Sequence, residues 1–565
     1  MESPEPRPSN AERSSQDIRA REDTPELVVA SPSSSDVNSR LGDLELEGSF
    51  AAHLLSIFST LPASWLPVLR AGLFDSLFEA FEDGGRRVDE LGEDYEVLAF
   101  AMLAYSSRAS AHPLLIGCSA PHSLPGIPSL PHDPSDSQSI ANSSPDDLRE
   151  YGKRREKACQ ALKQRAIQLA TERGTTLRTS AVNVASAYVL DMIETRDPSL
   201  TGTPFRASYV NQLRVLAEES HETFGDAWVW PGVLMREALM ALNDGTAPFF
   251  NNVDDVLLRS QPPQLMQELL HELDAEEQAG ADVLADPFSP DFAEQVRRLH
   301  NTITFAMTRL ARHCAEKITI PANRGFSLDL TFARSLSEHL TTLEALLRHL
   351  YSRSTAVLAL PADTVNARAL TRARFGLVIA HVSYPSLVLP VYLALQDHTS
   401  TRVPESVLGD LKARALGAIR LLATYPATRT PSWLATHIPL GTLSDWVAVL
   451  REAETVAAGE EGLTVEEKKR EMRWLVAGLQ RMGWAWGNNN DALIDDLEAQ
   501  LAELDVAHQH TPCTSQTPPN LSLVPSASTT AADVDKEPPS SPSLPTSSGR
   551  DIATSDASLN AAYRA

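Results

Sequence analysis

The sequence predicts an all-α fold, in which a large multi-helix array is flanked by disordered tails. Apolar residues recur at three- and four-residue steps over long stretches, most clearly in 292–314 and 336–350, and this spacing is typical of amphipathic helices. The strict alternation of apolar and polar residues that marks half-buried strands is essentially absent. Hydrophobic residues make up 42% of the 565 positions, which is enough for a sizeable core.

Both ends of the chain lack the composition of a packed domain. Residues 1–48 form an acidic stretch rich in Ser and Pro, and residues 506–565 are rich in Ser, Thr and Pro. Such segments bury too little apolar surface to offset the entropy that ordering costs, so we expect disorder in both. Acidic and apolar residues alternate in 41–50, as in short activation segments, although a simple lead into the first helix is the favoured interpretation.

The first helical part is expected to span 49–260. Its first helix begins near Ser49 and ends before Pro62, and a second amphipathic stretch, 65–81, ends at two glycines. A third helix begins near Glu96 and is apolar on most sides, which is typical of a helix buried in a larger core.

A stretch rich in Pro, Ser and Asp follows at 118–147, and it is too long for a compact connection. We therefore expect a mobile loop there. The next helix is expected to run to Gly174, because glycine is a natural helix C-cap. Further helices are expected over 180–197, 205–220 and 228–242.

The helical part is expected to continue over 261–505. Residues 261–296 carry nine acidic residues and no Lys or Arg, which favours a solvated helix with a flexible hinge over an acidic docking site. After the two long apolar stripes, more helices are expected within four ranges: 365–400, 404–425, 441–458 and 464–505. Five prolines are expected to break them: Pro385, Pro390, Pro404, Pro426 and Pro431.

Charge and cysteine content narrow the class of protein. The formal charge of −25 disfavours non-specific binding to nucleic acid, because such binding depends on cations that contact phosphates. The four cysteines are widely spaced: Cys118, Cys159, Cys314 and Cys513. A binuclear zinc cluster needs six thiolates within a few turns, so we assign no metal ligand and no cofactor. The low count also suits a reducing compartment.

No signal peptide and no membrane span are expected. The first fifteen residues contain no apolar core segment, and no uninterrupted run of about 18 apolar residues exists. A soluble intracellular protein is therefore predicted.

No catalytic signature is present, so the chain is not expected to be an enzyme. The dinucleotide, P-loop, nucleophile-elbow and paired-cysteine motifs are missing, and His271 lacks the second histidine of a zinc-peptidase helix. Two acidic groups, 252–255 and 490–498, could hold Mg²⁺ in the manner of helical prenyl-processing enzymes, since Mg²⁺ prefers oxygen ligands. Neither has a complete ligand pattern, and solvated faces and helix caps are the favoured interpretation.

One basic run is dense enough to suggest a function. It contains Lys153, Arg154, Arg155 and Lys157, which could form a nuclear import signal or contact phosphate. Because the run lies at the start of an amphipathic helix, a solvated helix face is the favoured interpretation. No DNA-recognition module surrounds it.

The stretch 96–117 ends its helix with Arg108, Ser110, His112 and Pro113. It resembles the start of the regulatory middle homology region of fungal zinc-cluster (Zn2Cys6-type) transcription factors, where a helix is followed by this Arg, Ser, His and Pro pattern. Three later segments resemble further helices of that region in the same order: 154–174, 180–197 and 230–255, the last of which begins with Trp230 and Pro231.

The resemblance implies a nuclear regulator of RNA polymerase II transcription whose helical domain senses an effector. Its partners would be the transcription machinery or a DNA-binding partner protein, with a small-molecule effector as a further ligand. The zinc cluster that defines the family is missing from this chain, so zinc and direct DNA binding would require a module that this sequence does not contain. Two alternatives stay open: a helical scaffold or adaptor outside transcription, and a magnesium-dependent prenyl-processing enzyme.

Several individual residues admit two interpretations. His112 could sense a ligand or the pH, but a hydrogen-bonded structural histidine at the helix end is favoured. Arg108 is expected to pair with an acidic group and so fix the turn. Four tryptophans could line a small-molecule pocket, although core packing is the favoured role: Trp228, Trp230, Trp484 and Trp486.

Overall fold

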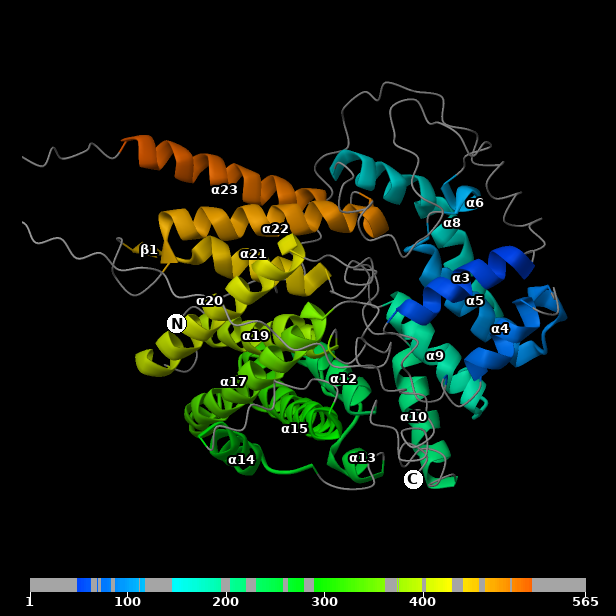
Figure 1. Cartoon of the computed structure of the whole chain (residues 1–565), viewed down its shortest axis with the longest axis horizontal. Coiled ribbons are helices and arrows are strands. Elements are labelled where there is room, and N and C mark those ends of the chain that lie inside the picture. The colour runs from blue at the N-terminus through cyan, green and yellow to red at the C-terminus, as the bar shows by residue number, and fades with distance from the viewer. Residues whose placement is uncertain are drawn as a thin grey trace, which may run out of the picture. The chain divides into compact units, whose positions relative to one another are not determined.

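The computed structural model describes residues 48–61, 69, 73–82, 87–110, 112–116, 145–194, 204–219, 230–257, 263–278, 289–360, 373, 375–398, 403–428, 440–456, 463–487 and 490–510. These residues belong to one compact unit, which extends to His510. They are almost entirely helical, which confirms the predicted all-α class (Figure 1). Strands within these ranges are limited to one parallel pair of two residues each, β1 (Thr455–Val456) and β2 (Leu463–Thr464).

The first group of helices surrounds α5 (Glu93–Ser107), which packs against α3, α8 and α9. Helix α5 is buried along most of its length, as its apolar sequence predicts. It begins three residues before the predicted Glu96, because Glu93 and Asp94 complete an acidic first turn that the helix dipole stabilises. The other helices of this group are α3 (Gly48–Thr60), α4 (Phe74–Glu82), α6 (Pro113–Ile116), α8 (Pro145–Glu172), α9 (Ala181–Glu194) and α10 (Pro204–Glu219), and a short 3-10 helix, η4, spans Val88–Glu90.

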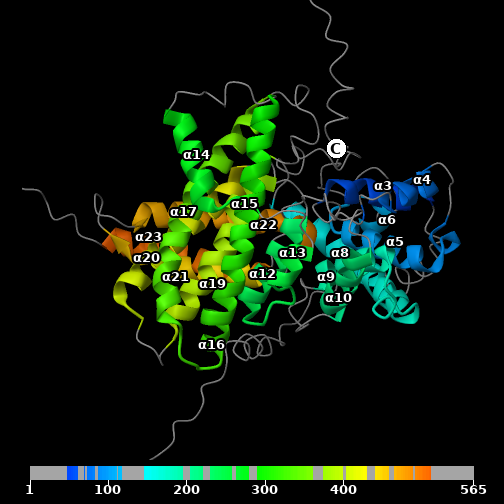
Figure 2. The same cartoon turned by 90° about the horizontal axis from the view of Figure 1, so that it is seen from below.

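A second group follows in the chain and packs around α15 (Pro290–Cys314) and α19 (Tyr384–Gln396). Figure 2 shows three of its helices, α14, α15 and α17, side by side. The other members are α12 (Trp230–Asp244), α13 (Asn252–Leu257), α14 (Met266–Gln278), η6 (Ala315–Thr319), α16 (Ile320–Asn323), α17 (Leu330–Ala359), η7 (Ile379–Ser383), α20 (Glu405–Thr428) and α21 (Leu440–Glu452). The two predicted apolar stripes lie on α15 and α17, whose stripe leucines are buried.

The end of the described chain returns to its beginning. The C-terminal end of α22 (Val465–Trp486) packs against the first part of α8, and α23 (Asp491–His510) packs against α22 (Figure 1). Glycines make the close approach between α8 and α22 possible: a Cβ placed on Gly152 would lie 2.1 Å from the carbonyl oxygen of Gly483. Residues more than three hundred positions apart in the sequence therefore share one helix interface.

Three of the predicted proline breaks are wrong. The chain remains helical through Pro385 and Pro390, because a π-helical segment, η7, precedes them and Pro385 falls in the first turn of α19. Pro426 likewise lies inside α20. The break at Pro404 is confirmed, since α20 begins at the next residue, and Pro431 lies outside the described residues.

The helical run Phe375–Gln396 is long and apolar enough to cross a membrane by length and composition, a feature that the search for uninterrupted apolar runs missed. His381, Ser383 and Tyr384 interrupt the apolar run, but they do not lower its mean hydropathy enough to exclude a membrane span by composition. In the structure most of this helix is buried in the core, where an apolar surface on all sides is also expected.

Several predicted boundaries can be compared directly with the structure. Gly174 follows α8 with a φ of 65°, which confirms its predicted role at the end of that helix. The first residues of the predicted C-terminal tail are helical, because α23 continues to His510. The predicted N-terminal tail (1–47), almost all of the predicted loop (118–144), the acidic hinge (279–288) and the rest of the C-terminal tail lie outside the described residues.

Candidate functional site

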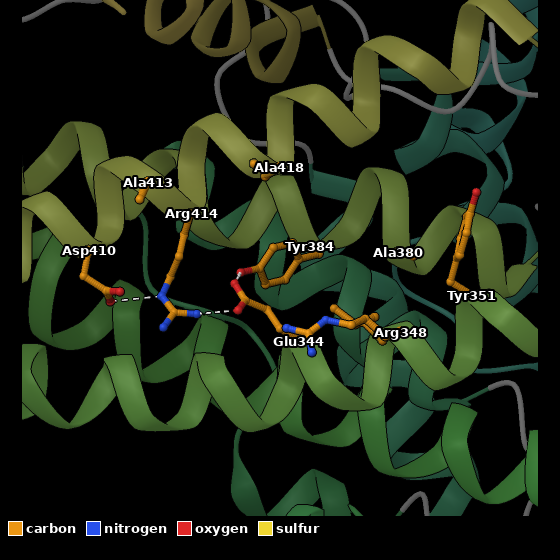
Figure 3. Close-up of a pocket in the computed structure, with 11 residues that line it drawn as sticks. Glu344, Arg348, Tyr351, Ala380, Tyr384, Asp410, Ala413, Arg414 and Ala418 are labelled. Carbon is orange, nitrogen blue, oxygen red and sulfur yellow. Dashed lines mark hydrogen bonds and ion pairs between the residues drawn. The ribbon is translucent and has the colours of Figure 1, made fainter. Parts of the chain in front are cut away.

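A cavity of about 520 Å³ lies between α17, the η7–α19 segment and α20 (Figure 3). This volume is within the range that small-molecule sites occupy in proteins. Its walls are formed by eleven residues: Glu344, Leu347, Arg348 and Tyr351 from α17, Ala380 and Tyr384 from η7 and α19, and Asp410, Ala413, Arg414, Gly417 and Ala418 from α20.

Small residues on α20 create the hollow. Ala413 and Gly417 are one turn apart, and Ala418 follows directly, so these three positions of the helix leave space beside the longer side chain of Arg414. A Cβ added at Gly417 would meet no atom within 4 Å, which shows that open space adjoins this position. Leu347 and Ala380 extend the apolar wall on the opposite elements.

One side of the cavity is polar, and its charged groups are paired with one another. Arg414 lies between two carboxylates, with its Nε 2.9 Å from Asp410 Oδ2 and its Nη1 2.6 Å from Glu344 Oε2 (Figure 3). The hydroxyl of Tyr384 donates a hydrogen bond to the other oxygen of Glu344. Both carboxylates are therefore engaged by donors from the protein.

The electrostatics of this network follow from burial and pairing. Burial alone would raise the pKa of Asp410, but hydrogen bonds from Arg414 and from Ser337 lower it below the usual value. Burial and the adjacent Glu344 charge raise the pKa of Tyr384, so its phenol stays protonated and keeps donating to Glu344. Asp410 is therefore ionised at neutral pH and stays paired with Arg414.

Two polar groups at the cavity have no such engagement. Among the described residues, the guanidinium of Arg348 has no ion-pair partner and the hydroxyl of Tyr351 has no hydrogen-bond partner. Figure 3 shows Arg348 beside Glu344 and Tyr351 farther along the same helix. The ring of Tyr351 contacts that of His381, with a centroid distance of 5.3 Å, which fixes its plane. A ligand that enters the cavity therefore meets one available cation and one available phenol.

The wall opposite α17 contains the π-helical turn η7. Its His381 is buried and hydrogen-bonded through Nδ1 to the carbonyl oxygen of Leu377 at 3.0 Å, and burial lowers its pKa, so it is neutral. Short π-helical turns occur frequently at functional sites, because the wider turn displaces side chains from the ordinary helical spacing.

The Arg, Ser, His and Pro pattern of 108–113 forms a structural corner at the end of α5. Arg108 pairs with Glu156 of α8, with Nη2 3.0 Å from Oε1, which confirms the predicted acidic partner. Ser110 is buried, and its hydroxyl accepts a hydrogen bond from the backbone N–H of His112 at 3.1 Å. His112 Nδ1 in turn accepts from the N–H of Leu114 at 3.3 Å. These contacts give His112 the structural role that was favoured, and Pro113 begins α6.

The basic run differs from its favoured interpretation at one position. Lys153 and Lys157 are exposed, and Arg154 pairs with Glu150 at 2.8 Å, as on a solvated face. Arg155 is instead completely buried, because its guanidinium stacks 4.0 Å from the ring centroid of Trp484 and donates to the carbonyl oxygen of Arg108. The sequence pattern of α8 alone could not reveal this contact with α22.

Of the four tryptophans, only the side chain of Trp484 lies in the described part of the structure, and it does not line the cavity. Trp484 is buried against Arg155 and Tyr151, which confirms core packing for this residue. Trp230 and Pro231 begin α12, but their side chains, and that of Trp486, lie outside the described residues, as does Trp228 altogether. None of the predicted site residues that the structure describes lines the cavity.

The predicted magnesium ligands in 252–255 are engaged by arginines. Asp254 lies 2.6 Å from Nε of Arg214, and Asp255 lies 3.0 Å from Nη1 of Arg312. In the second predicted group, 490–498, the carboxylates of Asp495, Asp496 and Glu498 are exposed on α23, and Asp491 lies 3.2 Å from Nε of Arg149. A different group has metal-binding geometry in the described part of the chain, since donor atoms of Asp274, Glu277 and His349 lie within 4.8 Å of one another, although both carboxylates are exposed.

Comparison of the chain with profiles of known protein families, with curated proteins and with solved structures found no match.

Proposed function

We propose that this chain is the effector-binding regulatory part of a transcription regulator similar to the fungal zinc-cluster factors, and that its effector occupies the cavity between α17, α19 and α20. The observation that carries the effector proposal is a cavity of ligand size with apolar walls and two available polar groups, Arg348 and Tyr351. The transcriptional role rests on the resemblance of 96–117 and the later helices.

The chemistry of the cavity suggests the class of effector. Leu347, Ala380 and the small residues of α20 favour an apolar body, because burial of apolar surface is the main source of affinity in such pockets. Arg348 favours an acidic group, and Tyr351 can add one hydrogen bond to it. A small apolar carboxylic acid satisfies both requirements.

A regulatory role fits the cavity better than catalysis. Arg414 and Tyr384 engage both carboxylates of the cavity, which leaves neither Glu344 nor Asp410 available as a general base. The π-helical turn gives an effector a direct contact with the core, because Ala380 lines the cavity and its neighbours in η7 are buried. Binding could thus shift how α17, α19 and α20 pack.

In this proposal the protein acts in the nucleus, through the transcription machinery or a DNA-binding partner protein. DNA would be contacted directly only through a module outside this sequence. Lys153, Arg154 and Lys157 would serve as the import signal, with Arg155 excluded by its burial.

The effector site is tested by filling it. Gly417→Leu projects a side chain into the cavity, whereas Gly409→Leu places the same side chain on the same helix at a position that also adjoins open space and does not line the cavity. Thermal-shift assays with straight-chain and aromatic carboxylic acids should show stabilisation of the wild type and of Gly409→Leu, and no stabilisation of Gly417→Leu. Equal stabilisation of all three proteins would refute the assignment of this cavity.

The transcriptional role needs a separate test. The full chain is fused to a heterologous DNA-binding domain, and expression of a reporter gene is measured in fungal cells. Reporter activity that depends on the chain supports the proposal. A tagged chain that is excluded from the nucleus and inactive in the reporter assay would favour the scaffold or adaptor alternative.

A further inference from the structure

A second cavity, of about 400 Å³, is lined by residues of 302–317 in α15 and η6, by Phe332 and His339 near the start of α17, and by residues 263–267, which precede and begin α14. It shares no lining residue with the first cavity. Its most distinctive feature is charge, because four basic side chains line it: Arg309, His313, Lys317 and His339.

Helical spacing explains why these cations gather. Arg309, His313 and Lys317 follow one another at four-residue steps along the end of α15 and into η6, so they lie on one face. His339 comes from α17, which packs against α15. A chain with a net charge of −25 repels anions in general, so this concentration of positive charge in a cavity is a local exception.

Acidic groups do not fully compensate these cations. Lys317 pairs with Asp329 at 3.1 Å. Arg309 has no ion-pair partner among the described residues, and its guanidinium lies 5.6 Å from the ring centroid of Phe305. Burial and then the nearby Arg309 charge lower the pKa of His313, which is the effect expected of a basic cluster without an anion.

Aromatic side chains accompany the cations. The ring of Phe332 meets that of His313 edge to face at a centroid distance of 5.9 Å, and the Lys317 ammonium lies 5.1 Å from the Phe332 centroid. Phe305, Leu310 and Met266 complete an apolar floor. His339 donates from Nδ1 to the carbonyl oxygen of Ser335 at 2.8 Å, an orientation that leaves Nε2 for another contact.

We propose that this cavity binds a phosphate-type dianion attached to an aromatic or apolar body, with Arg309 and Lys317 on the phosphate and Phe305 and Phe332 on the body. Arg309 and Lys317 place two cations at one site, which suits a dianion better than a single cation would, and arginine can donate two parallel hydrogen bonds to a phosphate. The site is independent of the effector cavity proposed above, and either can be correct without the other.

The test uses the full chain and two probes, inorganic phosphate and phenyl phosphate, titrated by isothermal calorimetry at constant ionic strength. Phenyl phosphate should bind more tightly than inorganic phosphate, because only the former can cover the aromatic floor. Arg309→Glu should weaken the binding of phenyl phosphate about tenfold or more, the loss expected when one charge-assisted hydrogen bond is removed. Arg309→Lys keeps the charge but not the two parallel donors, so its affinity should lie between those of the wild type and Arg309→Glu.

Arg334→Glu is the matched control, because Arg334 is also an exposed arginine, lies on α17 and does not line the cavity. It makes the same change in net charge and should leave the affinity unchanged. The proposal is overturned if neither probe binds the wild type, if the two probes bind equally, or if Arg334→Glu weakens binding as much as Arg309→Glu. Unchanged melting temperatures of the variants show that folding does not account for the difference.

Discussion

Gly152→Ala sets two opposing effects against each other at the contact between α8 and α22. In an exposed helix interior, replacing glycine by alanine stabilises by about 0.5–1 kcal/mol, because the unfolded chain loses less entropy on folding. At Gly152 the new Cβ would lie 2.1 Å from the carbonyl oxygen of Gly483 and 2.4 Å from the backbone nitrogen of Gly487. Both neighbours are backbone atoms, so no side-chain rotation can relieve the overlap.

The steric cost should exceed the gain in helix propensity. Overpacking of a core costs about 1–3 kcal/mol, and more where the backbone has to move. Helix α22 would have to shift away from α8 by more than half an ångström, which also disturbs the stacking of Trp484 on Arg155. We therefore expect Gly152→Ala to lower the free energy of unfolding by about 2 kcal/mol overall.

Urea denaturation followed by circular dichroism at 222 nm measures this change. Gly409→Ala is the control, because it makes the same substitution in α20, where a Cβ would meet nothing within 4 Å. The control should be more stable than the wild type by about 0.5–1 kcal/mol. If Gly152→Ala is as stable as the control, the close packing of α8 on α22 is refuted.

Three further predictions concern buried ionisable groups. Asp191 is completely buried between Arg206, at 3.2 Å, and Arg236, at 2.9 Å, so Asp191→Asn removes a buried charge that both guanidinium groups share, although Arg206 keeps its pair with Asp244 at 3.4 Å. The substitution should cost about 3 kcal/mol in urea denaturation, and a cost below about 1 kcal/mol would contradict the pairing. Burial raises the pKa of Asp445 to about 7, so its ionisation opposes folding, and stability should fall as the pH rises from about 4 to about 7. Asp445→Asn removes this loss and should raise the free energy of unfolding at pH 8 by about 1–2 kcal/mol, a figure that allows for the partial exposure of Asp445. At pH 4 the substitution should give no gain. An equal effect at pH 4 and pH 8 would count against the shifted pKa. Burial also raises the thiol pKa values of Cys159 and Cys314, so neither thiol should react with N-ethylmaleimide at pH 8 in the native protein. Peptide mapping should find both unmodified in the native protein and modified in 6 M guanidinium, which serves as the denatured control. Rapid labelling of either cysteine in the native state would disprove its burial.

Sequence patterns located the helices well because helix formation depends on local spacing. The range 180–197 contains α9 (Ala181–Glu194), and 205–220 nearly coincides with α10 (Pro204–Glu219). The proline rule was misleading at Pro385 and Pro390, since a π-helical turn and buried packing outweighed a local preference.

Features that depend on tertiary contacts were not predictable from local pattern. The burial of Arg155 requires Trp484, which lies far along the chain, and nothing near Arg155 in the sequence distinguishes it from its exposed neighbours. The cavity between α17, the η7–α19 segment and α20 combines three segments between 344 and 418, each of which looks ordinary alone. In contrast, the partner of Arg108 could be anticipated in kind, because a buried arginine at a turn needs an acidic neighbour.

The pairing of α8 with α22 also has a consequence for synthesis on the ribosome. Gly152 is made 331 residues before Gly483, the residue whose carbonyl oxygen it approaches most closely. At elongation rates of about 5–20 residues per second, this interval lasts roughly 17–66 s. During that time the face of α8 that later packs on α22, to which Arg155 belongs, has no native partner. This face is then available to chaperones. Release of the nascent chain before residue 487 would leave that face uncovered permanently, so truncated products should be recognised as misfolded and degraded.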